Sequence, residues 1–106
     1  MGIDETLVQE ITRRILATAR PSRIILFGSA ATCRMTRDSD IDLLVVEPNP
    51  GDTREESVRL LRALRGLGYG FDVFVIGAER FEETKDIIGG IAYPAHKYGK
   101  VIYEGT

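Results

Sequence analysis

The segment Asp-Ser-Asp-Ile-Asp-Leu-Leu-Val-Val, residues 38–46, constrains this chain more than any other part of its sequence. The run from Ile41 to Val46 is apolar at every position except Asp42, a pattern typical of a strand that is buried on both faces in the middle of a sheet. Side chains two residues apart in a strand share a face, so Asp40 and Asp42 point the same way, about 6.5 Å apart. The segment therefore predicts a central strand that begins with paired carboxylates.

Helical and strand patterns alternate along the rest of the chain. The predicted order is a helix over 4–19, strands over 23–27 and 41–46, a helix over 53–67, a strand over 71–76, a helix over 79–88, a mixed stretch over 89–98 and a short strand or extended tail over 101–103. Thr53 is predicted to cap the second helix in a capping box with Glu56. The residues of that helix predicted to face inward are Val58, Leu61, Ala63, Leu64 and Leu67. This order predicts a single α/β (α+β) domain over residues 1–106, with a small mixed sheet flanked by helices.

Bulk composition narrows the classes of function. A formal net charge of −2 argues against broad electrostatic attraction to nucleic acid or to an anionic membrane. No apolar run approaches about 18 residues, so no membrane-spanning segment is expected. The single cysteine, Cys33, cannot form an internal disulfide, and the first residues lack the pattern of a signal peptide, so a cytoplasmic location is expected. These features leave room for a small charged ligand.

A third carboxylate is expected near the first two. Asp72 lies at the start of the strand over 71–76, and the helix between the two strands favours a parallel pair with a right-handed crossover. Neighbouring parallel strands start at the same sheet edge, about 4.8 Å apart, so Asp72 can approach Asp40 and Asp42. Three unpaired carboxylates would repel one another, and bound Mg²⁺ would relieve that repulsion. Two such ions can stabilise both the attacking and the leaving oxygen of a phosphoryl or nucleotidyl transfer.

Gly28 and Ser29 end the strand over 23–27. If that strand is antiparallel to the next one, they lie beside Asp40 at the same sheet edge. A glycine turn leaves backbone N–H groups open to a phosphate, and a serine hydroxyl adds a hydrogen bond. Arg34 and Arg37 follow in the same segment and suit either contact with phosphate or solvation of the loop. These residues predict a triphosphate site next to the metal site.

Other interpretations of the acidic residues stay open at this point. Asp38 suits a turn or a cap, and Asp40 and Asp42 could be solvated acids at the end of a strand. Their spacing is also that of the first half of an EF-hand loop, but Leu43 and Asn49 stand where that loop needs glycine and glutamate. A phosphatase of the haloacid dehalogenase type would place its acid pair after the apolar strand, whereas here the pair precedes it.

The spacing of Gly28-Ser29, ten further residues, and Asp40-Ile-Asp42 before an apolar strand resembles the signature of the DNA polymerase beta-type nucleotidyltransferase superfamily. Phe71-Asp72-Val-Phe-Val resembles the strand that carries the third carboxylate of that family. The short chain and its ending, from Ile91 to Glu104, resemble the minimal nucleotidyltransferases of bacteria and archaea. The resemblance covers nearly the whole chain.

The resemblance implies a reaction and a role for each residue. Asp40, Asp42 and Asp72 would bind two Mg²⁺ ions, and Gly28 and Ser29 would hold the phosphates of ATP. The reaction would move AMP from ATP onto an acceptor hydroxyl and release pyrophosphate. Many minimal members pair with a small helical HEPN-domain protein, often as antitoxin and toxin, and some modify a tyrosine of that partner. Because the domain is small, a partner chain or a homodimer is expected to complete the site.

The loop after the first strand departs from the family's pattern. That loop usually reads Gly-Ser-Arg-Ala-Arg-Gly, whereas residues 28–33 here read Gly-Ser-Ala-Ala-Thr-Cys. Both loop arginines are absent, which leaves Arg34 and Arg37 as the nearby cations. Two functions from different classes follow. One is Mg²⁺-dependent nucleotidyl transfer to a protein hydroxyl, and the other is neutralisation of a partner protein by binding alone, with little or no catalysis.

Overall fold

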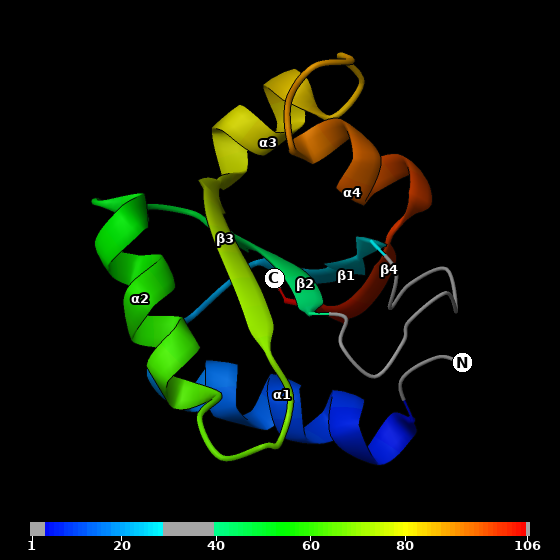
Figure 1. Cartoon of the computed structure of the whole chain (residues 1–106). Coiled ribbons are helices and arrows are strands. Elements are labelled where there is room, and N and C mark those ends of the chain that lie inside the picture. Colours follow the sequence, from blue (N-terminus) through cyan, green and yellow to red (C-terminus); the bar gives the residue numbers. More distant parts are fainter. Residues whose placement is uncertain (1–3, 29–39, 106) are drawn as a thin grey trace.

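The computed structural model describes residues 4–28 and 40–105, and within them a mixed sheet is covered by helices on both faces (Figure 1). The elements in chain order are α1 (Glu5–Thr18), β1 (Arg23–Phe27), β2 (Ile41–Glu47), α2 (Thr53–Ala63), β3 (Phe71–Gly77), α3 (Ala78–Thr84), α4 (Ala92–Tyr98) and β4 (Lys100–Glu104). The strands lie in the order β3-β2-β1-β4. The predicted fold class, a small mixed sheet flanked by helices, is confirmed.

Strand β2 has a hydrogen-bonded neighbour on each side, as predicted for a central strand. It runs antiparallel to β1, with Asp42 opposite Phe27, and parallel to β3, with Asp42 opposite Asp72. The C-terminal end of β1 and the N-terminal ends of β2 and β3 therefore lie at one edge of the sheet. This edge is where the sequence predicts the acidic site.

Two apolar clusters hold the sheet between its helices. On the α1 and α2 face the buried residues are Ile11, Ile15, Ile24, Leu26, Ile41, Leu43, Val45, Leu60 and Leu64. On the α3 and α4 face they are Ile25, Leu44, Val46, Ile76, Phe81, Ala92 and Ala95. Alternate residues of β2 enter opposite clusters because successive strand side chains point to opposite faces. No helix in the described ranges is long and apolar enough to cross a bilayer.

Helix α2 differs from the prediction at its start and in its buried face. Its N-cap is Asp52, whose carboxylate accepts hydrogen bonds from the backbone N–H of Arg54 and Glu55, so the predicted capping box from Thr53 is wrong. An aspartate directly before Thr53 takes the cap because its side-chain oxygen reaches the second and third N–H groups of the helix. The predicted inward face is wrong in part: Leu64 is buried and Leu67 packs against the core as predicted, but Val58 and Leu61 do not face inward. Leu60 and Leu64 are buried, whereas Val58 and Leu61 are 43% and 42% exposed.

The C-terminal third also folds differently from its sequence pattern. The helix predicted over 79–88 is the shorter α3, and the mixed stretch contains α4. Pro94 lies in the first turn of α4, where a helix does not need the backbone N–H that proline lacks. Strand β4 is a true edge strand, paired with β1, so of the two predicted alternatives the strand is confirmed.

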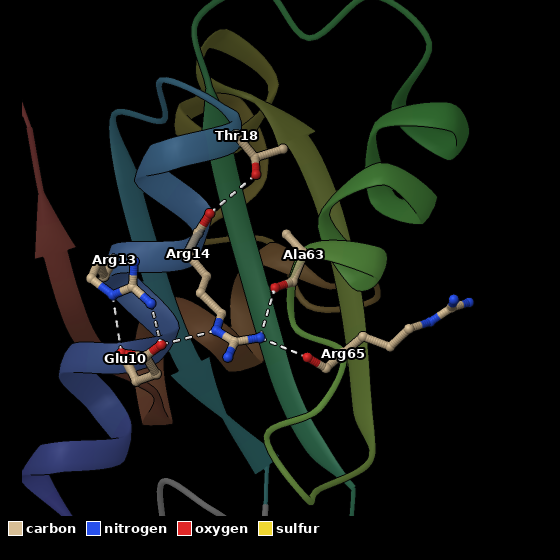
Figure 2. Close-up of polar contacts among 6 residues, drawn as sticks. All are labelled: Glu10, Arg13, Arg14, Thr18, Ala63 and Arg65. Atoms are coloured by element: carbon tan, nitrogen blue, oxygen red, sulfur yellow. Dashed lines mark hydrogen bonds and ion pairs between the residues drawn. The ribbon is translucent and has the colours of Figure 1, made fainter.

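Arg14 joins α1 to the end of α2 (Figure 2). Its guanidinium donates to the carbonyl of Arg65 at 2.6 Å and of Ala63 at 3.3 Å, and to Glu10 at 3.0 Å. The carbonyls at the end of a helix lack hydrogen-bond partners within the helix, so an arginine that donates to them stabilises the helix end. Arg13, one residue earlier, is largely exposed, and its side chain pairs with Glu10 alone among the hydrogen bonds and ion pairs of the described residues.

We expect Arg14→Met to lower the free energy of unfolding by about 1.5–2 kcal/mol, since hydrogen bonds to a charged donor are lost while the aliphatic stem is kept. Arg13→Met is the matched control and should leave stability unchanged, because its ion pair is at the surface. Urea unfolding measures both. Equal effects of the two substitutions would contradict the assigned role of Arg14.

Glu47 ends β2 as a buried acid, with 7% of its surface exposed. Burial raises its pKa to about 7, and a hydrogen bond with Glu56 on α2 and the charge of that residue add to the effect. Arg59 lies near enough to oppose this shift in pKa and forms an ion pair with Glu56. Glu47 Oε2 has no hydrogen-bond partner among the described residues. A protonated Glu47 that donates to the Glu56 carboxylate satisfies this arrangement best.

This arrangement predicts a pH dependence of stability. The folded-state pKa of Glu47, about 7, lies above the ordinary value of 4.5 for a glutamate, so the folded chain binds more protons than the unfolded chain between about pH 4.5 and pH 7. The contribution of Glu47 to stability is therefore lost as pH rises through that window. Glu47→Gln should remove this pH dependence. The free energy of unfolding of the variant, relative to that of wild type, should therefore rise by about 1 kcal/mol from about pH 5 to about pH 8. Glu55→Gln, an exposed control on the same helix, should keep the wild-type slope in denaturant titrations.

Candidate active site

The sheet brings three of the predicted residues together at one edge. Gly28 follows directly after β1, Asp42 is the second residue of β2, and Asp72 is the second residue of β3. Asp42 and Asp72 are register partners, and the two parallel strands place their side chains on the same face. The predicted parallel pair, and the predicted antiparallel pair that brings Gly28 to this edge, are confirmed.

Gly28 makes room for the carboxylate of Asp42. Its backbone has a φ of +72°, and a Cβ built on it would overlap Asp42 Oδ2. Both conditions demand glycine, since side-chain-bearing residues are strained at this φ and no side chain fits beside the carboxylate. The glycine predicted from its place in a phosphate turn thus also fixes the position of an acid.

Gly70 does the same for Asp40, and the sequence pattern did not indicate this role. A Cβ on Gly70 would overlap Asp40 Oδ1, and the Gly70 carbonyl accepts a hydrogen bond from the Ile41 backbone N–H at 2.9 Å. In the sequence Gly70 is the third of three alternating glycines and marks only the end of a helix and loop. Its position directly before β3 was the one available signal.

Burial and like charge raise the pKa of Asp42. The largest cause is burial, followed by the negative charge of Asp72, a hydrogen-bonding contact with that carboxyl, and the charge of Asp40. Phe27 stands opposite Asp42 on β1, and Phe74 lies two residues beyond Asp72 on the same face of β3. Within the described residues no lysine or arginine forms an ion pair with any of the three aspartates. The edge therefore carries crowded negative charge.

The donor set at this edge suits a hard divalent cation. Carboxylate oxygens are the ligands that Mg²⁺ prefers, and a cation would remove the repulsion that raises the pKa of Asp42. The side chains of the three aspartates lie near one another but do not point toward one common position. In residues 4–28 and 40–105, no three carboxylate, imidazole or thiol side chains stand close enough to hold a metal ion. Asp42 and Asp72 are in contact, while Asp40 lies against Gly70.

Three predicted phosphate-binding residues lie outside the described residues. Ser29, Arg34 and Arg37 all belong to the segment 29–39, as do Asp38 and Cys33. Their roles stay predictions. Of the predicted nucleotide-binding residues, the structure thus places Gly28.

A separate hollow of about 390 Å³ lies at the opposite end of the sheet, where Arg23 pairs with Val46. Arg23 forms its wall, bound to Glu104 at 2.8 Å and stacked over the ring of Phe81. These contacts satisfy the arginine, and the hollow lies far from the aspartates. The acidic edge is therefore the candidate site.

Comparison with protein families matches residues 7–94 to the nucleotidyltransferase domain family. The chain therefore belongs to the nucleotidyltransferase domain family, and the predicted resemblance to DNA polymerase beta-type enzymes is confirmed. A comparison with curated proteins gave no match.

Solved structures show the same fold. One from Sulfolobus solfataricus, named as a nucleotidyltransferase, matches with a TM-score of 0.64 at 19% identity over 93% of this chain and 78% of that chain. A toxin–antitoxin structure with AMP-PNP matches with a TM-score of 0.64 at 21% identity over 93% of this chain and 73% of that chain. At these identities the matches establish a shared architecture.

Gly28→Ala should displace the Asp42 carboxylate. We expect it to weaken Mn²⁺ binding, measured by calorimetry as a stand-in for Mg²⁺, by about ten-fold or more, since ligand orientation is lost. Gly51→Ala is the matched control. Gly51 has a similar φ of +67° but no atom near its Cβ position, so it carries the same backbone strain without the overlap. Equal metal binding by both variants would contradict the assigned role of Gly28.

Proposed function

We propose that this chain is an Mg²⁺-dependent nucleotidyltransferase that moves AMP from ATP onto a hydroxyl of a protein acceptor. The observation that carries the proposal is the contact of Asp42 with Asp72 beside Gly28, in a chain of the nucleotidyltransferase domain family. A pair of crowded carboxylates next to a glycine turn joins a cation site to a phosphate site. Such a pairing is what transfer of a nucleotide requires.

Each residue has a role in this proposal. Asp40, Asp42 and Asp72 hold Mg²⁺, with two ions expected. The backbone at Gly28 and Ser29 binds the phosphates, and Arg34 and Arg37 supply positive charge there. When bound, Mg²⁺ neutralises the phosphate oxygens, lowers the pKa of the acceptor hydroxyl and offsets the charge of the leaving pyrophosphate.

The transfer is a single displacement at the α-phosphorus of ATP. The acceptor oxygen forms a bond to the α-phosphorus, and the bond from that phosphorus to the bridging oxygen of the β-phosphate breaks. The electron pair of the broken bond leaves with pyrophosphate. The hydroxyl proton passes to Asp72 or to water beside it. The protein contributes orientation, since the register of the strands holds Asp42 and Asp72 side by side at one sheet edge, next to Gly28.

A partner protein is expected to complete the site. The toxin–antitoxin structure with AMP-PNP shares the fold, which supports a partner of toxin type, with a HEPN-domain protein as the expected class. A homodimer is the other arrangement that would enclose the acidic edge.

A second function is favoured by one observation, the absence of arginine and of the second glycine in residues 30–33. In that case the chain neutralises its partner by binding alone and turns over little or no ATP. The three aspartates support the catalytic function, because binding alone does not need them.

Label transfer tests the proposal. The purified chain is incubated with Mg²⁺, ATP labelled at the α-phosphate and the protein co-expressed with it. We expect label on that protein, and a loss of about a hundred-fold or more with Asp40→Asn, because several kcal/mol of transition-state stabilisation disappear. Glu83→Gln, an exposed acid on α3, is the control and should transfer label like wild type.

The outcomes separate the two functions. Label that is lost with Asp40→Asn establishes nucleotidyl transfer. The other outcome has two parts: wild type transfers no label to the partner, and the Asp40→Asn variant neutralises the partner as well as wild type does. That outcome establishes binding alone.

A further inference from the structure

The sheet face that carries Asp42 and Asp72 continues into two phenylalanines that the reaction above does not use. Phe74 lies two residues beyond Asp72 on β3, and Phe27 lies opposite Asp42 on β1. Their rings meet with centroids 6.0 Å apart and planes tilted by 51°. The two rings therefore reach toward one another across β2, next to the carboxylate pair.

Phe74 is an exposed aromatic residue of the sheet. Phe74 is 40% exposed, whereas Leu44, its register partner on β2, is fully buried. Strand β3 is at the end of the strand order, so its outer edge pairs with no strand among the described residues. An exposed aromatic ring beside a charged site is where a ligand gains apolar contact.

The geometry of the transfer assigns the two sides of this site. Asp42 lies on β2, the strand between β1 and β3. Gly28, at the end of β1, therefore lies on one side of Asp42, and Asp72, on β3, lies on the other side. Attacking and leaving oxygens lie roughly in line at the reacting phosphorus. With the pyrophosphate leaving toward Gly28, the acceptor must approach from the side of Asp72, which is the side of Phe74.

We infer that Phe74, supported by Phe27, forms an apolar subsite that binds the polypeptide segment carrying the acceptor hydroxyl. The inference rests on the proposed nucleotidyl transfer and adds a specificity-determining residue for its acceptor. The segment has an apolar side chain at or next to the hydroxyl, and this side chain packs on the Phe74 ring. Strand β3 ends the strand order, so no described strand lies beyond it on the Phe74 side of the sheet.

Two measurements on one variant test this subsite. Phe74→Ser removes the ring, and calorimetry with Mg²⁺ and AMP-PNP measures nucleotide binding while label transfer to the co-expressed partner measures the acceptor KM. We expect the acceptor KM to rise about ten-fold or more and the nucleotide Kd to stay within about two-fold, since one buried aromatic contact is worth about one decade in affinity. Phe74→Leu, which keeps an apolar contact, should recover most of the acceptor KM.

Val101→Ser is the matched control. Val101 is also an exposed apolar residue of an edge strand, 48% exposed on β4 at the other side of the sheet. It should change neither constant. Circular dichroism and thermal unfolding of both variants confirm that they fold.

Several results would overturn the inference. A nucleotide Kd weakened about ten-fold by Phe74→Ser would show that the ring contacts the nucleotide. An unchanged acceptor KM, or an equal rise with Val101→Ser, would show that the ring does not contact the acceptor.

Failure of the transfer reaction itself is distinguishable. If wild type transfers no label, the proposed function fails. Calorimetry of partner binding to wild type and to the two variants then shows whether the Phe74 ring contacts the partner. Binding weakened by Phe74→Ser and not by Val101→Ser keeps the ring as a contact for the partner. Equal binding by both variants, or no binding to wild type, overturns it.

Discussion

The opposite strand directions on the two sides of β2 are the constraint on which the rest of this structure depends. Because β1 runs antiparallel to β2 and β3 runs parallel to it, one strand end and two strand starts meet at one sheet edge. The register is held by residues 43–46, which are buried on both faces, since a slip of one residue would turn each side chain to the opposite cluster. Asp42 is thereby fixed between Gly28 and Asp72.

The two ends of β2 carry acids whose pKa values are both raised but whose surroundings differ. At Glu47 burial and Glu56 raise the pKa, and the nearby helix α2 encloses the group. At Asp42 burial and Asp72 raise the pKa, but the carboxyl stays partly exposed at an open sheet edge. An enclosed acid of this kind shares a proton with its neighbour. A partly exposed pair instead attracts a cation from solution.

Much of the fold could be predicted because strands and buried helices leave strong apolar patterns. The bounds of β1 and the central place of β2 follow from uninterrupted apolar runs. The buried face of α2 could be predicted only in part, at Leu64 and Leu67, because several leucines offer competing stripes and packing against α1 and the sheet buries Leu60 in place of Leu61. Helix α4 is short and contains Pro94, so tertiary packing rather than local propensity stabilises it.

The sequence by itself determined that Asp42 and Asp72 would begin neighbouring parallel strands at one sheet edge, since the apolar runs after them and the crossover helix between them follow from strand geometry. Only the tertiary structure decided what surrounds them. Gly70 leaves space for the carboxylate of Asp40, and the rings of Phe27 and Phe74 contact each other on the sheet face of Asp42, although these residues lie far apart along the chain. Such contacts depend on atomic distances between strands, and spacing along one sequence does not encode those distances.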